Sequence, residues 1–324
     1  MDKYIGIDLG GSHLRINDVD SDGKFGKERE VIVTSLLNNA TLEEILIRCI
    51  GEVAKRVMDK GNNIAGIGLG SPGPLNYKKG IIEMTPNLPN LENFPAVDIL
   101  GSSFPKYPSF LVHDSDAALL GEQWLGAAKN FQNVAMFTFG TGLGSAILSG
   151  GRLIRGNGRA VEAGHTDIDV GERRLCSCGR YNHWEAFVNT DGLVRTHYKA
   201  FQLPFVHSSP EQRQNISVMF RGWLSHRVDS KWSIVLSQYC EHVVLGLRNI
   251  VCNFNPECII LGGGILTGNE ELLEAIKKRW HEYMFENIKD NMVPLAEGVE
   301  IRLAKLSNAG VVGAAKYAMD QVKG

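Results

Sequence analysis

The sequence predicts an α/β fold made of two related domains that face each other. Three observations support this prediction. The chain has 324 residues, enough for two domains of ordinary size. Strand patterns and amphipathic helix patterns follow one another along its length. A strand, a glycine-rich bend and a second strand occur near residue 4 and again near residue 137, which indicates an internal repeat.

The composition is that of a soluble globular protein, with 44% hydrophobic and 22% charged residues. The formal net charge of −2 provides no basic field for nucleic acid or an anionic membrane. No apolar run approaches the ~18 residues of a membrane helix. The chain opens directly into a strand at 3–8, which leaves no room for a signal peptide. Four of the six cysteines lie in apolar patterns, so we expect a reduced, cytoplasmic enzyme rather than a disulfide scaffold.

The first repeat begins with a predicted hairpin, in which strands 3–9 and 13–19 flank Gly10, Gly11 and Ser12. Glycines let the backbone approach a ligand and point its N–H groups at that ligand. Asp8 lies at the mouth of the bend. It can coordinate magnesium through water or satisfy the amides of the turn, and both readings stay open.

A helix is predicted over 41–58 because its apolar residues recur at helical spacing. Thr41 and Glu44 form a capping box at its start. The next strand, 64–70, ends in Ser-Pro-Gly-Pro, and a proline-stiffened loop contains Asn87. An Asn side chain can donate to and accept from a hydroxyl, although it can equally hold a turn.

Two carboxylates follow the predicted strand 110–113, where a helix over 117–128 begins. Carboxylates between a strand end and a helix start often project into a ligand crevice. Asp116 is next to the Ala-rich run, so we expect it to be the helix N-cap. Asp114 is then available for chemistry.

The second repeat begins with strand 133–139, followed by Gly140, Thr141 and Gly142 and the returning strand 145–148. A dinucleotide-binding motif would need a helix after this bend, and a P-loop would need Gly-Lys-Ser/Thr; the sequence has neither.

The rest of the second repeat is predicted to contain two helices around a buried strand. That strand, 258–261, ends in three glycines, Gly262, Gly263 and Gly264, against which a base or a phosphate can lie. A strand over 299–304 and a helix of small residues over 309–319, suited to close packing, end the chain.

The stretch from 162 to 185 combines two kinds of chemistry. Two cysteines and two histidines can hold a tetrahedral zinc ion, and two glutamates can accept hydrogen bonds from a hydroxyl-bearing ligand. The residues are His165, Cys176, Cys178 and His183 for the metal and Glu162 and Glu185 for the ligand. The alternative is that the thiols are free and the histidines are ordinary surface or core groups.

These motifs, taken together and in this order, resemble those of the ROK family of sugar kinases and sugar-responsive repressors. The matching segments are Asp8–Gly11, Ser71–Pro74, Pro86–Leu88, Asp114 before Ala117, Gly140–Gly144, Glu162–His165, Cys176–Gly179 with Glu185, and Leu261–Gly264. The resemblance implies an actin-like ATPase (ribonuclease H-like) fold with two domains flanking a cleft. We expect a small domain of residues 1–116 plus 307–324 and a large domain of residues 117–306.

The resemblance also implies the role of each motif. Asp114 would be the general base that takes a proton from a sugar hydroxyl, which then attacks the terminal phosphate of ATP with magnesium bound. The sugar contacts would be Asn87, His113, Asp114, Glu162, His165 and Glu185. Phosphate and magnesium contacts would be Asp8, Gly10, Gly11, Ser12, Gly140, Thr141 and Gly142, with Gly262, Gly263 and Gly264 at the adenosine. His165, Cys176 and Cys178 would bind structural zinc.

Three positions depart from the family pattern. His183 stands where a Cys is usual, and His is still a competent zinc ligand. His113 replaces the usual Asn before the catalytic Asp, which bears on the identity of the sugar because imidazole presents a different donor and acceptor. Asp116 also replaces an Asn, a mild change at a helix cap.

We therefore expect a cytoplasmic ATP-dependent hexose kinase that acts on the 6-hydroxyl, with glucose as the leading substrate. Alternative substrates are mannose, N-acetylglucosamine, N-acetylmannosamine and allose. Family members are often dimers, so we also expect a homodimer.

Rivals from other classes are less consistent with the sequence. A sugar-sensing repressor needs a helix-turn-helix of ~60 residues before the first hairpin, where this chain begins. A non-catalytic sugar-binding protein would not need both Asp114 and the Gly140 bend, and an ATPase that binds no sugar would not need Glu162 and Glu185.

Overall fold

The structure is a computed structural model of two compact units. It describes residues 1–10, 13–27, 29–32, 40–84, 92–158, 161–204, 208–209, 211–215, 218, 220, 222, 230–286 and 296–324. Unit 1 comprises Met1–Asn130, Arg155–Ala160 and Lys305–Gly324, and unit 2 comprises Phe131–Ile154 and Val161–Ala304. The cleft expected between the two units stays a prediction.

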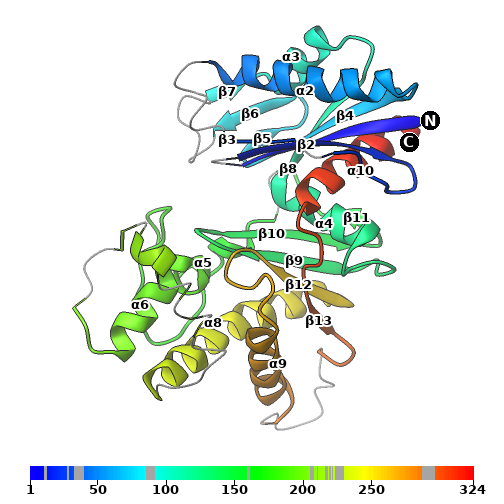
Figure 1. Cartoon of the computed structure of the whole chain (residues 1–324). Coiled ribbons are helices and arrows are strands. Elements are labelled where there is room, and N and C mark those ends of the chain that lie inside the picture. The colour runs from blue at the N-terminus through cyan, green and yellow to red at the C-terminus, as the bar shows by residue number, and fades with distance from the viewer. Residues whose placement is uncertain are drawn as a thin grey trace. The chain divides into compact units, whose positions relative to one another are not determined.

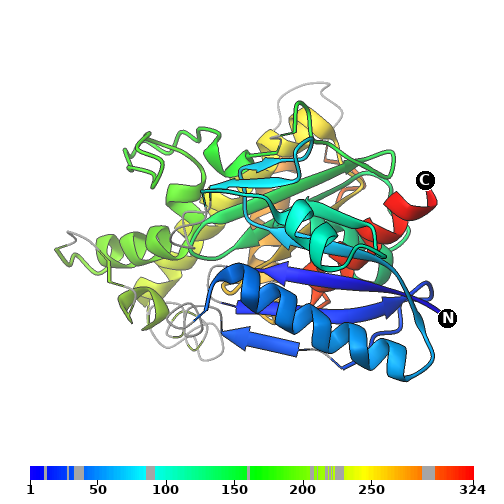
Figure 2. The same cartoon turned by 90° about the horizontal axis from the view of Figure 1, so that it is seen from above.

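Unit 1 is built on a five-stranded sheet with the order β3-β2-β1-β4-β8. The strands are β1 (Asp2–Leu9), β2 (His13–Asp20), β3 (Arg29–Ile32), β4 (Asn63–Ser71) and β8 (Ser109–His113). The first three are antiparallel neighbours, whereas β4 and β8 run parallel to β1. Helix α2 (Leu42–Asp59) buries its apolar residues against this sheet (Figures 1 and 2). Its predicted Thr41–Glu44 capping box is confirmed.

Helices α4 (Asp114–Leu125) and α10 (Ala309–Lys323) pack against each other in unit 1 (Figure 1). Their backbones come unusually close. A Cβ atom at Gly313 would lie 1.6 Å from the carbonyl oxygen of Ala117, and one at Gly121 would lie 2.4 Å from that of Ala309. The close packing predicted for the last helix is therefore confirmed.

An insertion between β4 and β8 adds a small sheet to unit 1. Its strands are β5 (Leu75–Asn76), β6 (Ile81–Met84) and β7 (Glu92–Phe94), and helix α3 (Ala96–Ser103) follows them. Asn87 was predicted to contact the sugar from the loop in this insertion, but it lies outside the described residues.

Unit 2 repeats the sheet of unit 1, with the order β11-β10-β9-β12-β13. Its strands are β9 (Val134–Phe139), β10 (Leu143–Ser149), β11 (Arg152–Leu153), β12 (Cys258–Gly262) and β13 (Glu300–Leu303). Strand directions match those of unit 1 position by position. The internal repeat inferred from the two glycine bends is therefore confirmed, and so is the α/β, actin-like fold.

The helices of unit 2 with bounds in the described residues include η1 (Ala163–His165), α5 (Glu185–Val188), α6 (Thr190–Ala200), α8 (Ser230–Phe254) and α9 (Glu270–Phe285). Helices α8 and α9 pack with the sheet to form the main apolar core (Figure 1). Among the described residues, no helix combines the length and the apolarity that a membrane span requires.

One prediction about α4 is wrong. The helix begins at Asp114 with His113 as its N-cap, so Asp116 lies inside the first turn and is not the cap. Its side chain is buried and accepts a hydrogen bond from Nε of Arg155 at 3.0 Å. The cap rule considers only neighbours in sequence, whereas this carboxylate is fixed by a residue from a distant part of the chain.

Candidate active site

The parallel strands of unit 1 bring three of the predicted segments to one edge of its sheet. Strands β1, β4 and β8 run in the same direction, with Asp8 opposite Gly70 and Ser71 opposite His113. Carboxyl ends of parallel strands share one edge, which is where ligands of such sheets bind. Gly10, the Ser71–Pro74 turn and Asp114 therefore lie along the same edge of unit 1.

Asp114 is placed by the start of α4 and is half-buried, with 38% of its side chain exposed. Its Oδ1 accepts hydrogen bonds from the amide of Ser115 at 2.6 Å and the Ser115 hydroxyl at 3.2 Å. The same oxygen lies 3.1 Å from Nδ1 of His113. All three contacts are made by Oδ1, so Oδ2 is the oxygen we expect to receive a proton.

Asp8 lies against the first turn of α10. A Cβ atom at Gly310 would come within 2.7 Å of the Asp8 carboxyl carbon, so a side chain at this position would require the carboxylate to move. The N-terminus of a helix carries partial positive charge and favours an anion. Gly10 closes the bend by donating its N–H to the carbonyl of His13 at 2.8 Å, while Gly11 and Ser12 lie outside the described residues.

The second glycine bend, in unit 2, is held by side chains and backbone of α5 and α6. Leu143 donates its amide to Oε2 of Glu185 at 2.8 Å, and Asn189 donates its side-chain amide to the carbonyl of Thr141 at 3.1 Å. The amide of Thr190 donates to the carbonyl of Gly140 at 2.8 Å. Thr141 itself is exposed. The bend is thus fixed on one side and open on the other, as a phosphate cradle requires.

The predicted adenosine edge lies beside this bend, because β9 and β12 are parallel and end together. Gly263 has φ +89°, and a Cβ atom there would lie 2.3 Å from the carbonyl oxygen of Phe139, the last residue of β9. Gly264 is exposed, with open space where a side chain would be. Gly262 ends β12 and is buried. The Gly140 bend and the glycine turn therefore form one edge of unit 2.

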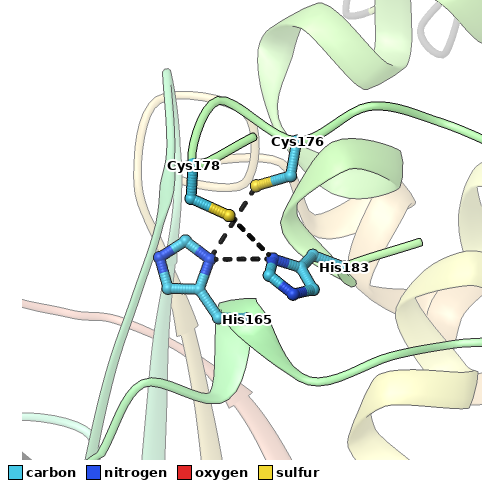
Figure 3. Close-up of side chains that lie close together, drawn as sticks. All are labelled: His165, Cys176, Cys178 and His183. Carbon is cyan, nitrogen blue, oxygen red and sulfur yellow. Dashed lines mark hydrogen bonds between the residues drawn. The ribbon is translucent and has the colours of Figure 1, made fainter. Parts of the chain in front are cut away.

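The two cysteines and two histidines of unit 2 converge, as Figure 3 shows, and one ligand atom of each lies within 4.8 Å of all the others. Nδ1 of His183 is 3.1 Å from Sγ of Cys178 and 3.2 Å from Nδ1 of His165. Sγ of Cys176 is 3.8 Å from Nδ1 of His165. Ligands of tetrahedral zinc, with bonds of about 2.0–2.3 Å, are separated by comparable distances. The four side chains therefore fit such an ion.

Two charged groups lie near the cluster. Burial, followed by smaller contributions that include the nearby Glu185 carboxylate, raises the pKa of the Cys176 thiol to about 11. A dication would reverse this by binding the thiolate. Nε2 of His183 lies 3.8 Å from a carboxylate oxygen of the exposed Asp167, which is longer than a hydrogen bond.

Glu185 connects the cluster to the glycine bend. While Oε2 accepts from Leu143, Oε1 accepts from the Ser177 hydroxyl at 3.1 Å and from the Cys176 thiol at 3.6 Å. Trp184 fixes the preceding position, because its indole is fully buried and its N–H donates to the carbonyl of His242 at 2.8 Å. Glu185 is thus tied to both sites within unit 2.

Glu162, the other predicted acceptor, is exposed and precedes η1. The helix packs closely on the site, since a Cβ atom at Gly164 would lie 2.9 Å from the carbonyl oxygen of Leu143 and 3.5 Å from Cβ of Glu185. The structure therefore brings the Glu162–His165 segment, Glu185, the cluster and the Gly140 bend together in unit 2. Asp8, Gly10, His113 and Asp114 belong to unit 1.

Several residues of these sites were missed from sequence. Asp167 carries a weak signal, since it follows a predicted zinc ligand by two positions. Asn189 precedes a helix and suggests a cap, which it is, but its second bond to the Gly140 bend has no local signature. Gly310 lies against Asp8, and Arg155 binds Asp116. Both pairs are far apart in sequence and meet only when the chain folds.

The repeated sheet and its paired glycine bends define a member of the actin-like ATPase class. The ROK family model matches residues 4–321, and the chain belongs to this family. The recognition made from the motifs is therefore confirmed.

The chain is similar in sequence and in structure to sugar kinases over nearly its whole length. The chain is 27% identical over 326 residues to a glucokinase of Thermotoga maritima, covering 99% of each chain. Its structure resembles that of a ROK hexokinase from Thermus thermophilus, with a TM-score of 0.80, 30% identity and 99% of each chain covered. A ROK glucokinase from Streptomyces griseus, solved with glucose and AMPPNP, gives a TM-score of 0.72 at 25% identity and covers 98% of this chain and 99% of that one.

Proposed function

We propose that this chain, as an ATP-dependent hexose kinase, transfers the terminal phosphate of ATP to the 6-hydroxyl of glucose. The observation that carries the proposal is the matched pair of sheet edges. One edge bears a glycine bend beside Asp114, and the other bears a glycine bend beside Glu162, Glu185 and the Cys–His cluster. The similarity to glucokinases over nearly the whole chain supports glucose as the sugar.

In this proposal, Asp114 is the general base. Its Oδ2 accepts the proton of the 6-hydroxyl as the hydroxyl oxygen bonds to the terminal phosphorus, and the bond from that phosphorus to the leaving ADP oxygen breaks. Phosphoryl transfer depends mainly on positioning and on neutralising charge. The short bonds from Ser115 and the nearby His113 hold the carboxylate in one orientation for this step.

The glycine bends supply the phosphate contacts. Amides of Gly11 and Ser12 in one bend and of Gly142 in the other would donate to phosphate oxygens, with the Thr141 hydroxyl. Gly10 and Gly140 would contribute by letting the backbone approach the phosphates, because their own N–H groups close the two bends. The adenosine would lie on Gly262, Gly263 and Gly264. Asp8 would hold magnesium through water, and the bound cation supplies charge neutralisation at the phosphates.

The sugar would be bound by Asn87, His113, Glu162, His165 and Glu185. His165 can serve two purposes, because its Nδ1 faces the cluster and its Nε2 lies on the opposite side of the ring (Figure 3). His165, Cys176, Cys178 and His183 would hold a structural zinc ion. When bound, that ion would fix the loops that carry Glu162 and Glu185.

Replacing the proposed base tests this function directly. We expect Asp114→Asn to lower kcat by ~10²–10⁴-fold, the range that positioned proton transfer contributes, while glucose binding measured by calorimetry is largely retained. The matched control is Asp98→Asn, which removes an exposed carboxylate from the first turn of another helix of unit 1. Near-normal turnover by Asp114→Asn would remove Asp114 from this role.

A coupled assay with ATP and a panel of sugars separates the substrates. Glucose should give the highest kcat/KM among glucose, mannose, N-acetylglucosamine, N-acetylmannosamine and allose. Because His113 replaces an Asn beside the base, a preference for another hexose would point to this position. Sugar binding without turnover of any of these sugars would favour a non-catalytic sugar-binding protein.

We also propose a magnesium-dependent homodimer in the cytoplasm. All six cysteines lie in described residues and are free, which is consistent with a reducing compartment. Reversal of EDTA inhibition by Mg²⁺ tests the cation, and light scattering of the purified protein tests the dimer.

A further inference from the structure

Arg155 of unit 1 makes a set of contacts that have no part in the proposed binding of sugar and phosphate. Its Nε donates to Oδ2 of Asp116 at 3.0 Å, and its Nη1 donates to the Tyr317 hydroxyl at 3.0 Å. The guanidinium lies over two aromatic rings, 4.5 Å from the centroid of Tyr77 and 4.8 Å from that of Tyr317. This planar stacking and forked donation suit Arg and cannot be reproduced by Lys.

The partner of Arg155 is a carboxylate in the same helical turn as Asp114. The side chain of Asp116 is 3% exposed. Burial raises the pKa of Asp116, the charge of Arg155 opposes this shift, and Asp114 adds to it by repulsion. The two carboxylates therefore interact electrostatically, and the cation of Arg155 is what compensates one of them.

The charged and titratable groups around this turn come from four segments. His113 and Asp114 lie on the chain of α4, Tyr77 follows β5, Tyr317 lies on α10, and Arg155 lies on the connector after β11. The Tyr77 hydroxyl also accepts a hydrogen bond from the backbone of His113, and burial raises its pKa. Arg155 is the permanent cation among these groups.

A buried ion pair is weak evidence for stability, because desolvating two charges offsets most of their attraction. Its position here is more informative. The pair fixes the first turn of α4, next to Asp114, and Arg155 belongs to the segment from which the chain continues to Glu162.

We propose that Asp116 and Arg155 form a positioning pair for Asp114, in which Arg155 balances the negative charge that Asp116 places beside the base and holds the first turn of α4 in place. This rests on the proposed function, in which Asp114 must be ionised to accept a proton. Neither residue touches the substrate in this role. Both set the charge and the orientation of the residue that does.

The test is the pH profile of kcat/KM for glucose at saturating ATP, whose acid limb reports the ionisation of the base in the free enzyme. Arg155→Met leaves Asp116 uncompensated, so the limb should move to higher pH by on the order of one unit. Asp116→Asn removes the negative charge and keeps an acceptor for Nε, so the limb should move to lower pH. The double variant removes both charges, and its limb should return close to the wild-type position.

The same variants separate positioning from affinity. Arg155→Met should lower kcat about 10- to 100-fold, because small displacements of a catalytic group are costly, with KM for ATP little changed. Arg155→Lys keeps the charge and loses the stacked fork, so it should keep the wild-type limb with a smaller loss of kcat. It also provides a readout if the Met variant fails to fold.

The control variant is Arg56→Met, which removes a partly buried Arg–Asp pair with Asp18 elsewhere in unit 1. It should lower the unfolding temperature and leave the acid limb in place. If Asp114→Asn abolishes turnover while Arg155→Met and Asp116→Asn both keep the wild-type limb, the positioning pair is wrong and the kinase proposal stands. If Asp114→Asn keeps near-normal turnover, Asp114 is not the base, and both its proposed role and the positioning pair fail.

Discussion

Unit 1 and unit 2 use the same sheet but hold their functional edges in different ways. In unit 1, close backbone packing holds much of the edge, in addition to the Arg155–Asp116 pair at the start of α4. Gly310 lets α10 approach Asp8, and Gly313 and Gly121 let α10 and α4 touch through their main chains. In unit 2, the edge is fixed by side chains, since Glu185 and Asn189 reach the Gly140 bend and Glu185 also reaches the Cys–His cluster.

The difference follows from where each copy of the repeat carries its insertion. Unit 1 inserts β5, β6, β7 and α3 between two strands of its sheet, so α4 and α10 still cover the sheet directly. Unit 2 inserts the cluster, α5 and α6 between its first hairpin and α8, and this insertion lies on the bend itself. Added volume at the glycines of α4 and α10 should therefore test how the first edge is held, and removal of the side chains that reach the Gly140 bend should test the second.

The largest effect is expected from added volume in unit 1. Gly313→Ala would place a Cβ atom 1.6 Å from the backbone oxygen of Ala117, so α4 and α10 must separate. We expect a loss of about 3 kcal/mol or more in the free energy of unfolding, at the upper end of overpacking costs, measured by urea denaturation.

Gly51→Ala is the matched control for this change. Gly51 lies in α2 with open space at its Cβ position, so the same substitution should stabilise the protein by about 0.5–1 kcal/mol through helix propensity. Equal effects at the two positions would contradict the close approach of the two helices.

Removing one cluster ligand should have the next largest effect, confined to unit 2. Purified protein should contain about one zinc ion per chain, as expected for a four-ligand site, and Cys178→Ser should lose it. Because Glu185 joins the cluster to the bend, hydrogen exchange at the Leu143 amide should then accelerate. The control Cys252→Ser removes an exposed thiol of α8 and should change neither result. Fully active wild-type protein without zinc would reduce the cluster to ordinary turns.

The parts of this molecule that were predictable from sequence are those with local or repeated signals. The strand–bend–strand pattern predicted both hairpins, and the Thr41–Glu44 spacing predicted a cap that the structure contains. The convergence of His165, Cys176, Cys178 and His183 was also expected from their order. Each of these signals depends on residues that are neighbours in the chain or recur in both halves.

The parts that were not predictable depend on contacts between distant segments. Asp116 resembles a helix cap locally, and only Arg155, from a connector beyond the next hairpin, shows that it is a buried ion pair. The tight approach of Gly310 to Asp8 likewise joins the two ends of the chain. Sequence spacing contains no information about such pairs, because the distance between the two residues is set by how distant segments pack.

The smallest and most selective effect is expected at Asn189, which has two separate bonds. Its Oδ1 accepts from the amide of Gly192 at 2.7 Å as the N-cap of α6, and its Nδ2 donates to Thr141 at 3.1 Å. Asn189→Asp keeps the cap, since Asp is an equally good N-cap, but cannot donate to the bend. We expect the KM for ATP to rise about tenfold, the equivalent of one hydrogen bond of roughly 1.4 kcal/mol.

Asn189→Ala completes this comparison because it removes both bonds. It should raise the KM for ATP to a similar degree and also lower the free energy of unfolding by about 1 kcal/mol through the lost cap. An Asp variant with the wild-type KM for ATP would show that the bend of unit 2 does not depend on this side chain. Glu185 and the backbone amide of Thr190 would then be the contacts that hold the bend of unit 2. Backbone contacts would in that case matter in unit 2 as they do in unit 1.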